Sequence, residues 1–215
     1  MLDIDVAQLV ALQLLVLVVS TAVGVVAFGF AMTMTPFLLI FLEPRLVVEI
    51  NLVLTTVLFA SVTAHSWRYI NVRTLLALLV GGAVGIPLGV LFTKSIAEGA
   101  LSLTLTGVVI ITAILATVSK FRYFSREGLA AIPIGGLFTF INAGLALGGP
   151  IVVLFALNQR WGRDQTRAML SSFFLVTGIA ILASHVLTGL LGVDELRNAS
   201  LFVPGLIAGS MIASR

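Results

Sequence analysis

The side chains that could bind a small ligand in this chain stand isolated within long apolar stretches. Residues 9–42 and 128–157 contain no Asp, Glu, Lys or Arg. Amide and hydroxyl groups inside such stretches could donate hydrogen bonds to an oxyanion. Each could equally bond to a carbonyl of a neighbouring helix. The candidate donors in these and the other apolar stretches are Thr33, Thr35, Asn51, Asn142, Ser171 and Ser172.

The same two stretches carry clusters of glycine and proline that should interrupt a helix. A helix that restarts after a break presents free N–H groups and the positive end of its dipole, and both attract anions. Kinking or close helix packing is the alternative for any single glycine. A pair of interrupted stretches in a membrane protein indicates a substrate site. The residues expected to open the helices there are Gly24, Gly29, Pro36, Gly144, Gly148, Gly149 and Pro150.

Titratable side chains are scarce near these stretches. Arg167 precedes the apolar residues 168–190, where its guanidinium could hold an oxyanion bidentately or extend to the membrane surface. Proton-coupled carriers usually keep an acid or a histidine inside the membrane. Glu49, His65 and His185 are the candidates, and only His185 lies well inside an apolar stretch. Glu49 and His185 could therefore form a proton relay, with a structural hydrogen bond as the alternative for the histidine.

No combination of side chains indicates an enzyme. The chain has no Cys, no residues with the spacing of metal ligands, no paired nucleophile and base, and no phosphate-binding loop. We therefore expect no catalytic activity, no metal and no cofactor. The missing phosphate-binding loop also argues against a pump that hydrolyses its own nucleotide.

The composition requires a membrane. Hydrophobic residues make up 60% of the chain and charged residues 10%, with a mean hydropathy of +1.19. A soluble domain carries about 25% charged residues, so this chain cannot cover a water-exposed surface. The net charge of +3 does not indicate nucleic acid, because the basic residues are scattered among short loops. The lipid bilayer is therefore the expected surroundings.

Seven apolar stretches should form helices, because a continuous apolar run satisfies its backbone in lipid only as a helix. Aligning Pro36 with Pro150 matches their neighbours, and residues 80–82 resemble residues 203–205. The chain should therefore be an all-α polytopic membrane protein of two repeats, the second lacking its last helix. The expected repeats are residues 1–122, with stretches 9–42, 46–64, 74–93 and 99–119, and residues 123–215, with stretches 128–157, 168–190 and 198–214.

The basic residues favour a particular topology. If every stretch crosses the membrane once, six of the twelve basic residues lie on each side of the membrane. If residues 9–42 and 128–157 each enter and return as a re-entrant hairpin, they divide nine against three, which is the asymmetry expected of a membrane protein. The hairpins also make the two repeats inverted and place the N-terminus outside. The side of the membrane with only three basic residues then holds Arg45, Lys94 and Arg197.

Short motifs of small and apolar residues recur along the chain. Residues 81, 85 and 89 are glycines four apart, which predicts a helix face for close packing. The other motifs are Phe-Gly-Phe-Ala at 28–31, Pro-Phe-Leu-Leu at 36–39, Asn-Leu at 51–52, Gly-Gly-Pro at 148–150, Asn-Gln-Arg-Trp at 158–161 and Arg-Ala at 167–168. By these motifs, over nearly its whole length, the sequence resembles the sulfite exporter TauE/SafE family.

The resemblance implies a permease of the bacterial or archaeal inner membrane that moves sulfite, sulfoacetate or other organosulfonates. We therefore expect a secondary transporter whose partners are a small anion and the bilayer, with a homo-oligomer left open. The residues expected to bind the anion are Gly29, Thr33, Thr35, Pro36, Asn51, Asn142, Gly144, Gly148, Gly149, Pro150 and Arg167. A non-transporting scaffold or assembly subunit is the alternative, favoured by the short second repeat. A channel is less favoured because no ring of charge could act as a filter.

Overall fold

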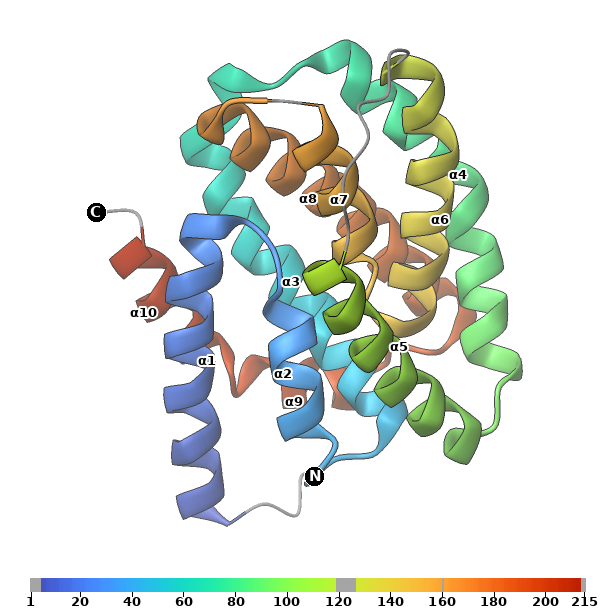
Figure 1. Cartoon of the computed structure of the whole chain (residues 1–215). Coiled ribbons are helices and arrows are strands. Elements are labelled where there is room, and N and C mark those ends of the chain that lie inside the picture. Colours follow the sequence, from blue (N-terminus) through green and yellow to red (C-terminus); the bar gives the residue numbers. More distant parts are fainter. Residues whose placement is uncertain (1–4, 119–126, 160, 214–215) are drawn as a thin grey trace.

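The computed structural model describes residues 5–118, 127–159 and 161–213, and these residues fold into a bundle of helices (Figure 1). The membrane-protein architecture expected from composition is confirmed. By length and apolar composition, five helices of the described chain could each cross a membrane, and a bent pair near the C-terminus would make a sixth. The elements are α1 Val6–Val26, α2 Phe30–Leu38, α3 Pro44–Ser66, η1 Trp67–Tyr69, α4 Val72–Ser95, α5 Glu98–Val118, α6 Glu127–Leu145, α7 Gly149–Asn158, α8 Arg163–Thr188, α9 Val193–Ser200 and α10 Val203–Ala213.

Each of the two uncharged stretches is a long helix followed by a break and a short helix. Residues 9–42 contain α1 and α2, and residues 128–157 contain α6 and α7. Figure 1 shows α2 running back toward the end of the bundle where α1 begins, and α7 running back toward the end where α6 begins. The chain therefore reverses direction within both stretches, and their re-entrant course in a membrane stays a prediction.

The breaks lie at residues 27–29 and 146–148, and they match each other closely. Ala27 and Ala146 both adopt the left-handed conformation, with φ of 62° and 57°. Each N–H reaches back four residues to close the preceding helix, to the carbonyls of Val23 and Asn142 at 2.6 and 2.8 Å. Gly29 then takes φ of 97°, a conformation that favours glycine, before α2 begins.

This geometry corrects the alignment of Pro36 with Pro150. Matching the two breaks pairs Ala27 with Ala146, which are 119 positions apart. The alignment of Pro36 with Pro150 uses a shift of 114 positions instead. Pro36 lies inside α2, while Pro150 occupies the first turn of α7, where a missing N–H costs nothing. Gly24 is likewise inside α1 and packs against α10 instead of opening a helix.

Helices α3 and α8 cross antiparallel through the middle of the bundle. Phe59 and Phe174 stack with ring centroids 4.6 Å apart. One turn away on each helix, a Cβ added to Gly178 would collide with the hydroxyl of Thr56, so glycine lets the two backbones approach. This pair forms the frame against which both hairpins pack.

Small residues hold the remaining helices close together in parallel pairs. A Cβ on Gly81 would meet the carbonyl of Ile132, and a Cβ on Gly89 would meet the carbonyl of Phe140. The contacts advance in the same direction along α4 and α6, so the two helices run parallel. Helices α1 and α10 also run parallel, with the Gly205 N–H donating to Gln13 Oε1 at 3.0 Å. The glycines four apart are thus a packing face.

The two predicted units exchange helices in the bundle, and their inverted relation stays a prediction. The first helix of each broken stretch packs on a helix of the other unit, α1 on α10 and α6 on α4, while α3 and α8 meet antiparallel. The division at residues 122 and 123 falls among residues 119–126, which lie outside the described chain, so the repeat boundary stays a prediction.

The last apolar stretch differs from the expected single helix over residues 198–214. It consists of α9, which begins earlier at Val193, and α10, and the two meet at an angle of 49°. Pro204 at the second position of α10 explains the bend, because proline has no N–H and its ring clashes with the preceding turn.

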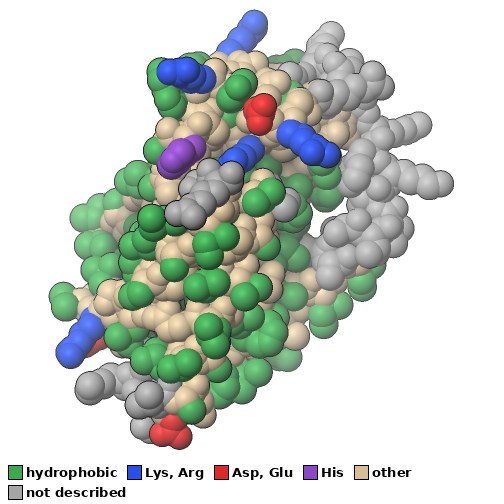
Figure 2. Space-filling view, turned by 90° about the vertical axis from the view of Figure 1, so that its left-hand side faces the viewer, with side chains coloured by type: hydrophobic (Ala, Val, Ile, Leu, Met, Phe, Trp, Pro, Cys, Tyr) green, Lys and Arg blue, Asp and Glu red, His purple; other side chains and the backbone are tan. Residues whose placement is uncertain are grey.

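The described basic side chains gather at the two ends of the bundle, with hydrophobic side chains over the face between them in Figure 2. Contacts between η1 and α8 place the end of α3 beside the start of α8. Seven basic residues are described, and their division agrees with the hairpin topology; the other five lie outside the described ranges. One end carries Arg68, Arg73, Arg163 and Arg167, and the other carries Arg45, Lys94 and Arg197.

We expect Gly85→Ala to destabilise the α4–α6 pair. A Cβ at position 85 would collide with the Gly136 carbonyl and the Thr139 hydroxyl, and such overpacking costs about 1–3 kcal/mol. Gly107→Ala in α5 is the matched control, because a Cβ there meets nothing within 4 Å. Thermal unfolding of the purified protein in detergent should show a lower midpoint for Gly85→Ala alone. Equal midpoints for the two variants would show that α4 and α6 do not pack as described.

Candidate functional site

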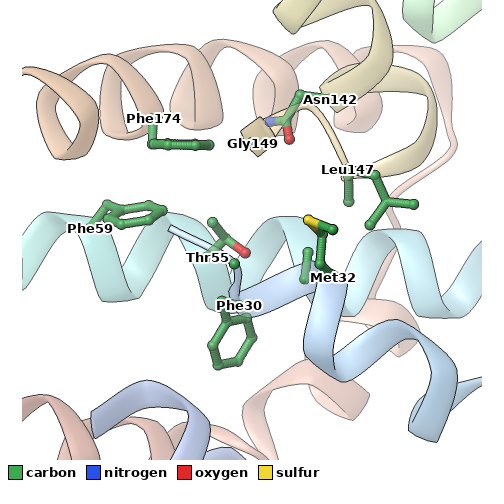
Figure 3. A pocket seen from close by; sticks show the side chains of 11 residues that line it. Phe30, Met32, Thr55, Phe59, Asn142, Leu147, Gly149 and Phe174 are labelled. Atoms are coloured by element: carbon green, nitrogen blue, oxygen red, sulfur yellow. The ribbon is translucent and has the colours of Figure 1, made fainter. Parts of the chain in front are cut away.

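The two breaks meet at one pocket near the centre of the bundle (Figure 3). The space between its lining atoms amounts to about 290 Å³, open solvent at its mouth included. In Figure 3, Gly149 and Asn142 lie on one side of the space, and Thr55, Phe30 and Met32 lie on the other. The lining residues come from both breaks and from the α3–α8 frame: Gly29, Phe30, Ala31, Met32, Thr55, Phe59, Asn142, Ala146, Leu147, Gly149 and Phe174.

Two helix N-termini contribute to the pocket wall. Helix α2 begins at Phe30, and its first hydrogen bond within the helix is made by the Thr33 N–H to the Gly29 carbonyl at 3.0 Å. The N–H groups of residues 30–32 precede that bond and have no acceptor among the described residues. Helix α7 begins at Gly149 and adds a further unpaired N–H and a second dipole end.

Asn142 connects the end of α6 to the start of α7. Its Oδ1 accepts the N–H of Gly148 at 3.4 Å, across the break. Its side chain is buried and lines the pocket, and its Nδ2 group makes no hydrogen bond within the described chain. The amide therefore has a donor available on the pocket side.

Thr55 is a polar lining residue that the sequence did not single out. Its Oγ1 is buried and has no hydrogen-bond partner in the described structure. The neighbouring Thr56 instead bonds to the Leu52 carbonyl at 2.7 Å, which is the ordinary arrangement for threonine in a helix. No sequence signal distinguishes these two threonines, because only the packing of α3 decides which hydroxyl is left unpaired.

The rest of the wall is aromatic and aliphatic. Phe59 and Phe174 stack at one side, and Phe138 meets Phe174 edge to face with centroids 5.0 Å apart. No Lys or Arg is among the lining residues. Because such a wall is mostly apolar, the dipoles and amide groups act there through a lower dielectric than water, which strengthens their attraction for charge.

Several predicted ligands lie elsewhere. Thr33 and Pro36 are exposed on α2, and the Thr33 hydroxyl bonds to the Gly29 carbonyl at 3.0 Å. Asn51 and Thr35 are buried together, with Asn51 Nδ2 donating to Thr35 Oγ1 at 3.0 Å, away from the pocket. Gly144 packs against Phe92. Gly148 stands in the break, while Pro150, Ser171 and Ser172 do not line the pocket.

Arg167 is also outside this pocket. It lines two other cavities at the end of the bundle where α8 begins, one of them shared with His65 and Gly24. Charged side chains at that depth can reach the membrane surface, which is the alternative that the sequence left open. The structure thus places neutral donors at the centre and this cation near the end.

Glu49 and His185 are brought into contact, although 136 residues separate them. His185 Nδ1 lies 2.7 Å from Glu49 Oε1, and its Nε2 lies 3.1 Å from the Ala143 carbonyl. Both side chains are buried, at 2% and 0% exposure. Within the described ranges, no group of three or more His, Cys, Asp or Glu residues is placed to hold a metal ion.

Comparison with known proteins agrees with this architecture. No curated protein and no solved structure matches the chain. A family model does match, over residues 12–215, and its description is sulfite exporter TauE/SafE. The match covers nearly the whole chain, including both breaks, the α3–α8 frame and the glycine contacts of α4. The family is one of membrane transporters and not of enzymes. The chain belongs to the sulfite exporter TauE/SafE family.

Proposed function

We propose that this chain is a secondary transporter for small sulfur-containing anions such as sulfite or organosulfonates. The anion binds between the two breaks, in the pocket lined by Gly29, Asn142 and Gly149. The observation that carries the proposal is the convergence of two half-helix N-termini on one partly open pocket. Helix starts are anion sites, and paired interrupted helices are where transporters bind their substrates.

The chemistry of the donors suits an oxyanion that must also be released. Backbone N–H groups, the Asn142 amide and the Thr55 hydroxyl are all neutral. They can surround a pyramidal or tetrahedral group with several oxygens without fixing it as a bidentate arginine would. Such donors select charge and size, which agrees with a family whose name refers to sulfite.

The two hairpins also supply a route to alternating access. Each returns before completing a second crossing, so each half of the molecule closes one side of the central pocket. Small tilts of α4–α6 against α1–α10 about the α3–α8 frame would expose the pocket to one side and then the other.

A binding screen tests the proposal directly. Purified protein is titrated with sulfite, sulfate, thiosulfate and an alkylsulfonate by calorimetry, and the bound anion is then followed as a labelled solute in proteoliposomes. We expect saturable binding and transport of at least one sulfur anion. Absence of both for the whole panel would reject the function.

Thr55→Val should weaken sulfite binding without harming the fold. The change removes a hydroxyl that has no protein partner, and a hydrogen bond to a charged group contributes about 1.5–3 kcal/mol, roughly a tenfold or greater rise in Kd. Thermal stability should stay equal or rise, because an unpaired buried hydroxyl is removed. Thr56→Val is the matched control and should keep the wild-type Kd while losing its bond to Leu52. Equal Kd values for both variants would remove Thr55 from the site.

Gly149→Leu should block the pocket. A Cβ at position 149 meets only Phe174, at 3.6 Å, so the larger side chain extends into the space and overpacking raises the sulfite Kd by about 10- to 100-fold. Asn142→Ala should also weaken binding, because it removes a donor and the bond to Gly148. Gly162→Leu, in open space, is the control. Wild-type transport by both pocket variants would disprove the site.

The proposal includes an orientation in the bacterial or archaeal inner membrane, with the N-terminus outside. The majority of basic residues then faces the cytoplasm. Because the chain has no Cys, single substitutions report topology cleanly. A membrane-impermeant maleimide should label Asp5→Cys in intact cells and Asp164→Cys only after permeabilisation. The opposite pattern would invert the orientation.

A further inference from the structure

The buried contact between Glu49 and His185 requires a proton that the anion pocket does not explain. His185 Nε2 lies 3.1 Å from the Ala143 carbonyl, and a hydrogen on this nitrogen makes that contact a hydrogen bond. Nδ1 would then be a bare lone pair in a neutral ring. A lone pair and a carboxylate oxygen repel each other, yet Nδ1 and Glu49 Oε1 are 2.7 Å apart. One additional proton must therefore lie between them.

The second oxygen of Glu49 is the unexplained atom of this pair. Oε2 is buried and has no hydrogen-bond partner among the described residues, although the side chain is only 2% exposed. A buried carboxylate is retained only when it is paired, protonated or functional. The second oxygen of Glu49 is thus left for a ligand that the protein itself does not supply.

A separate cavity gives access to that carboxyl group. The space between its lining atoms amounts to about 760 Å³, open solvent at its mouth included, and Glu49 is part of its wall. Exposed Glu43 and Glu98 lie at its rim, and Glu195 of α9 also lines it. Arg45 is the one basic residue in this lining, and it donates to the Ile96 carbonyl at 3.1 Å. The surplus of acids favours cations, including hydronium, at the entrance.

The pair is also connected to the anion pocket through one residue. The Ala143 carbonyl that accepts from His185 belongs to the neighbour of Asn142, in the last turn of α6 before the break. Thr93 of α4 fixes the same turn by donating to the carbonyls of Ala143 and Gly144 at 3.3 and 2.9 Å. A movement of His185 would therefore displace the end of α6 that carries a pocket donor.

We propose that Glu49 and His185 bind the proton that drives anion transport, and that this proton enters through the acidic cavity. This inference rests on the proposed transport function. Proton uptake converts a carboxylate and a neutral imidazole, with net charge −1, into a neutral pair. A water in the cavity donates that proton and is left as hydroxide, or a hydronium ion donates it and is left as water.

Proton binding at Glu49 and His185 should favour anion binding in the pocket. A pair with charge −1 repels an anion in the nearby pocket through a medium of low dielectric, whereas the protonated pair does not. Proton and anion should therefore bind cooperatively, and by reciprocity each raises the affinity for the other. Release of the proton leaves an unpaired buried charge and weakens the contact of Glu49 with His185, which favours the alternative conformation. The result is symport of one anion with one proton.

The first test needs no anion. His65→Gln leaves His185 as the single histidine, so ¹⁵N-histidine NMR reports its ring alone. Infrared spectra of the same sample report a protonated carboxyl group. At neutral pH we expect the proton to be visible either on Nδ1 or on a carboxyl group that disappears in Glu49→Gln. A neutral ring beside a bare carboxylate would overturn the proton site.

The second test uses ³⁵S-sulfite with the wild type, Glu49→Gln and the control Asp164→Asn, an exposed acid at the opposite end of the bundle. The wild type and the control should bind sulfite more tightly as pH falls and accumulate it into alkaline liposomes, up to about tenfold per pH unit for one proton per anion. Glu49→Gln should bind sulfite and exchange it across the membrane but accumulate none. Sulfite takes up protons itself, so the comparison with Asp164→Asn isolates the contribution of Glu49.

The outcomes separate the two proposals. If Glu49→Gln keeps the pH dependence and accumulation of the control, the coupling role is wrong while the anion pocket stands. If no protein binds sulfite or any other anion of the panel, the transport function fails and the coupling fails with it, even where the spectra show the proton.

Discussion

The whole structure depends on one constraint, which is that backbone polar groups cannot remain unpaired in lipid. A chain can interrupt a membrane helix only where other protein covers the break. Here the two breaks, at residues 27–29 and 146–148, face the same interior pocket and are covered by α3 and α8. The free N–H groups that the constraint would otherwise forbid become the donors of a site. The same requirement explains why each hairpin is short and why both meet at the centre.

The antiparallel α3–α8 pair allows this arrangement. Its close approach at Gly178 holds the aromatic wall formed by Phe59 and Phe174 against the breaks. Farther along the same two helices, that approach brings Glu49 to His185. One helix pair therefore carries both a wall of the proposed anion pocket and the buried titratable contact, and a shift between the two helices would affect both. The parallel pairs α1–α10 and α4–α6 are held by small residues, which is the packing that our proposal of a tilt around this frame uses.

The sequence predicted much of this organisation because its signals are physical necessities. Low charge and long apolar runs require membrane helices, and the distribution of basic residues favoured two hairpins. The positions of the breaks were less accessible. Pro36 is an obvious interruption in sequence, yet a proline near the end of a short helix is tolerated, and the break occurs at Ala27, whose left-handed conformation has no sequence signature. Thr55 was missed for a similar reason, since only packing separates it from Thr56. Glu49 and His185 were selected individually, but contact across 136 residues cannot be read from spacing.

The neutral character of the pocket follows from what a transporter must do. A buried arginine at the centre would be costly to place and would hold an oxyanion through two charge-assisted bonds, which slows release. Dipole ends, an amide and a hydroxyl attract the same anion with less energy, so it can leave on either side. The use of neutral donors also affects the driving force for anion transport. Neutral donors cannot balance the charge of an anion moving against the membrane potential, and the proton that we propose to bind at Glu49 and His185 would supply that positive charge.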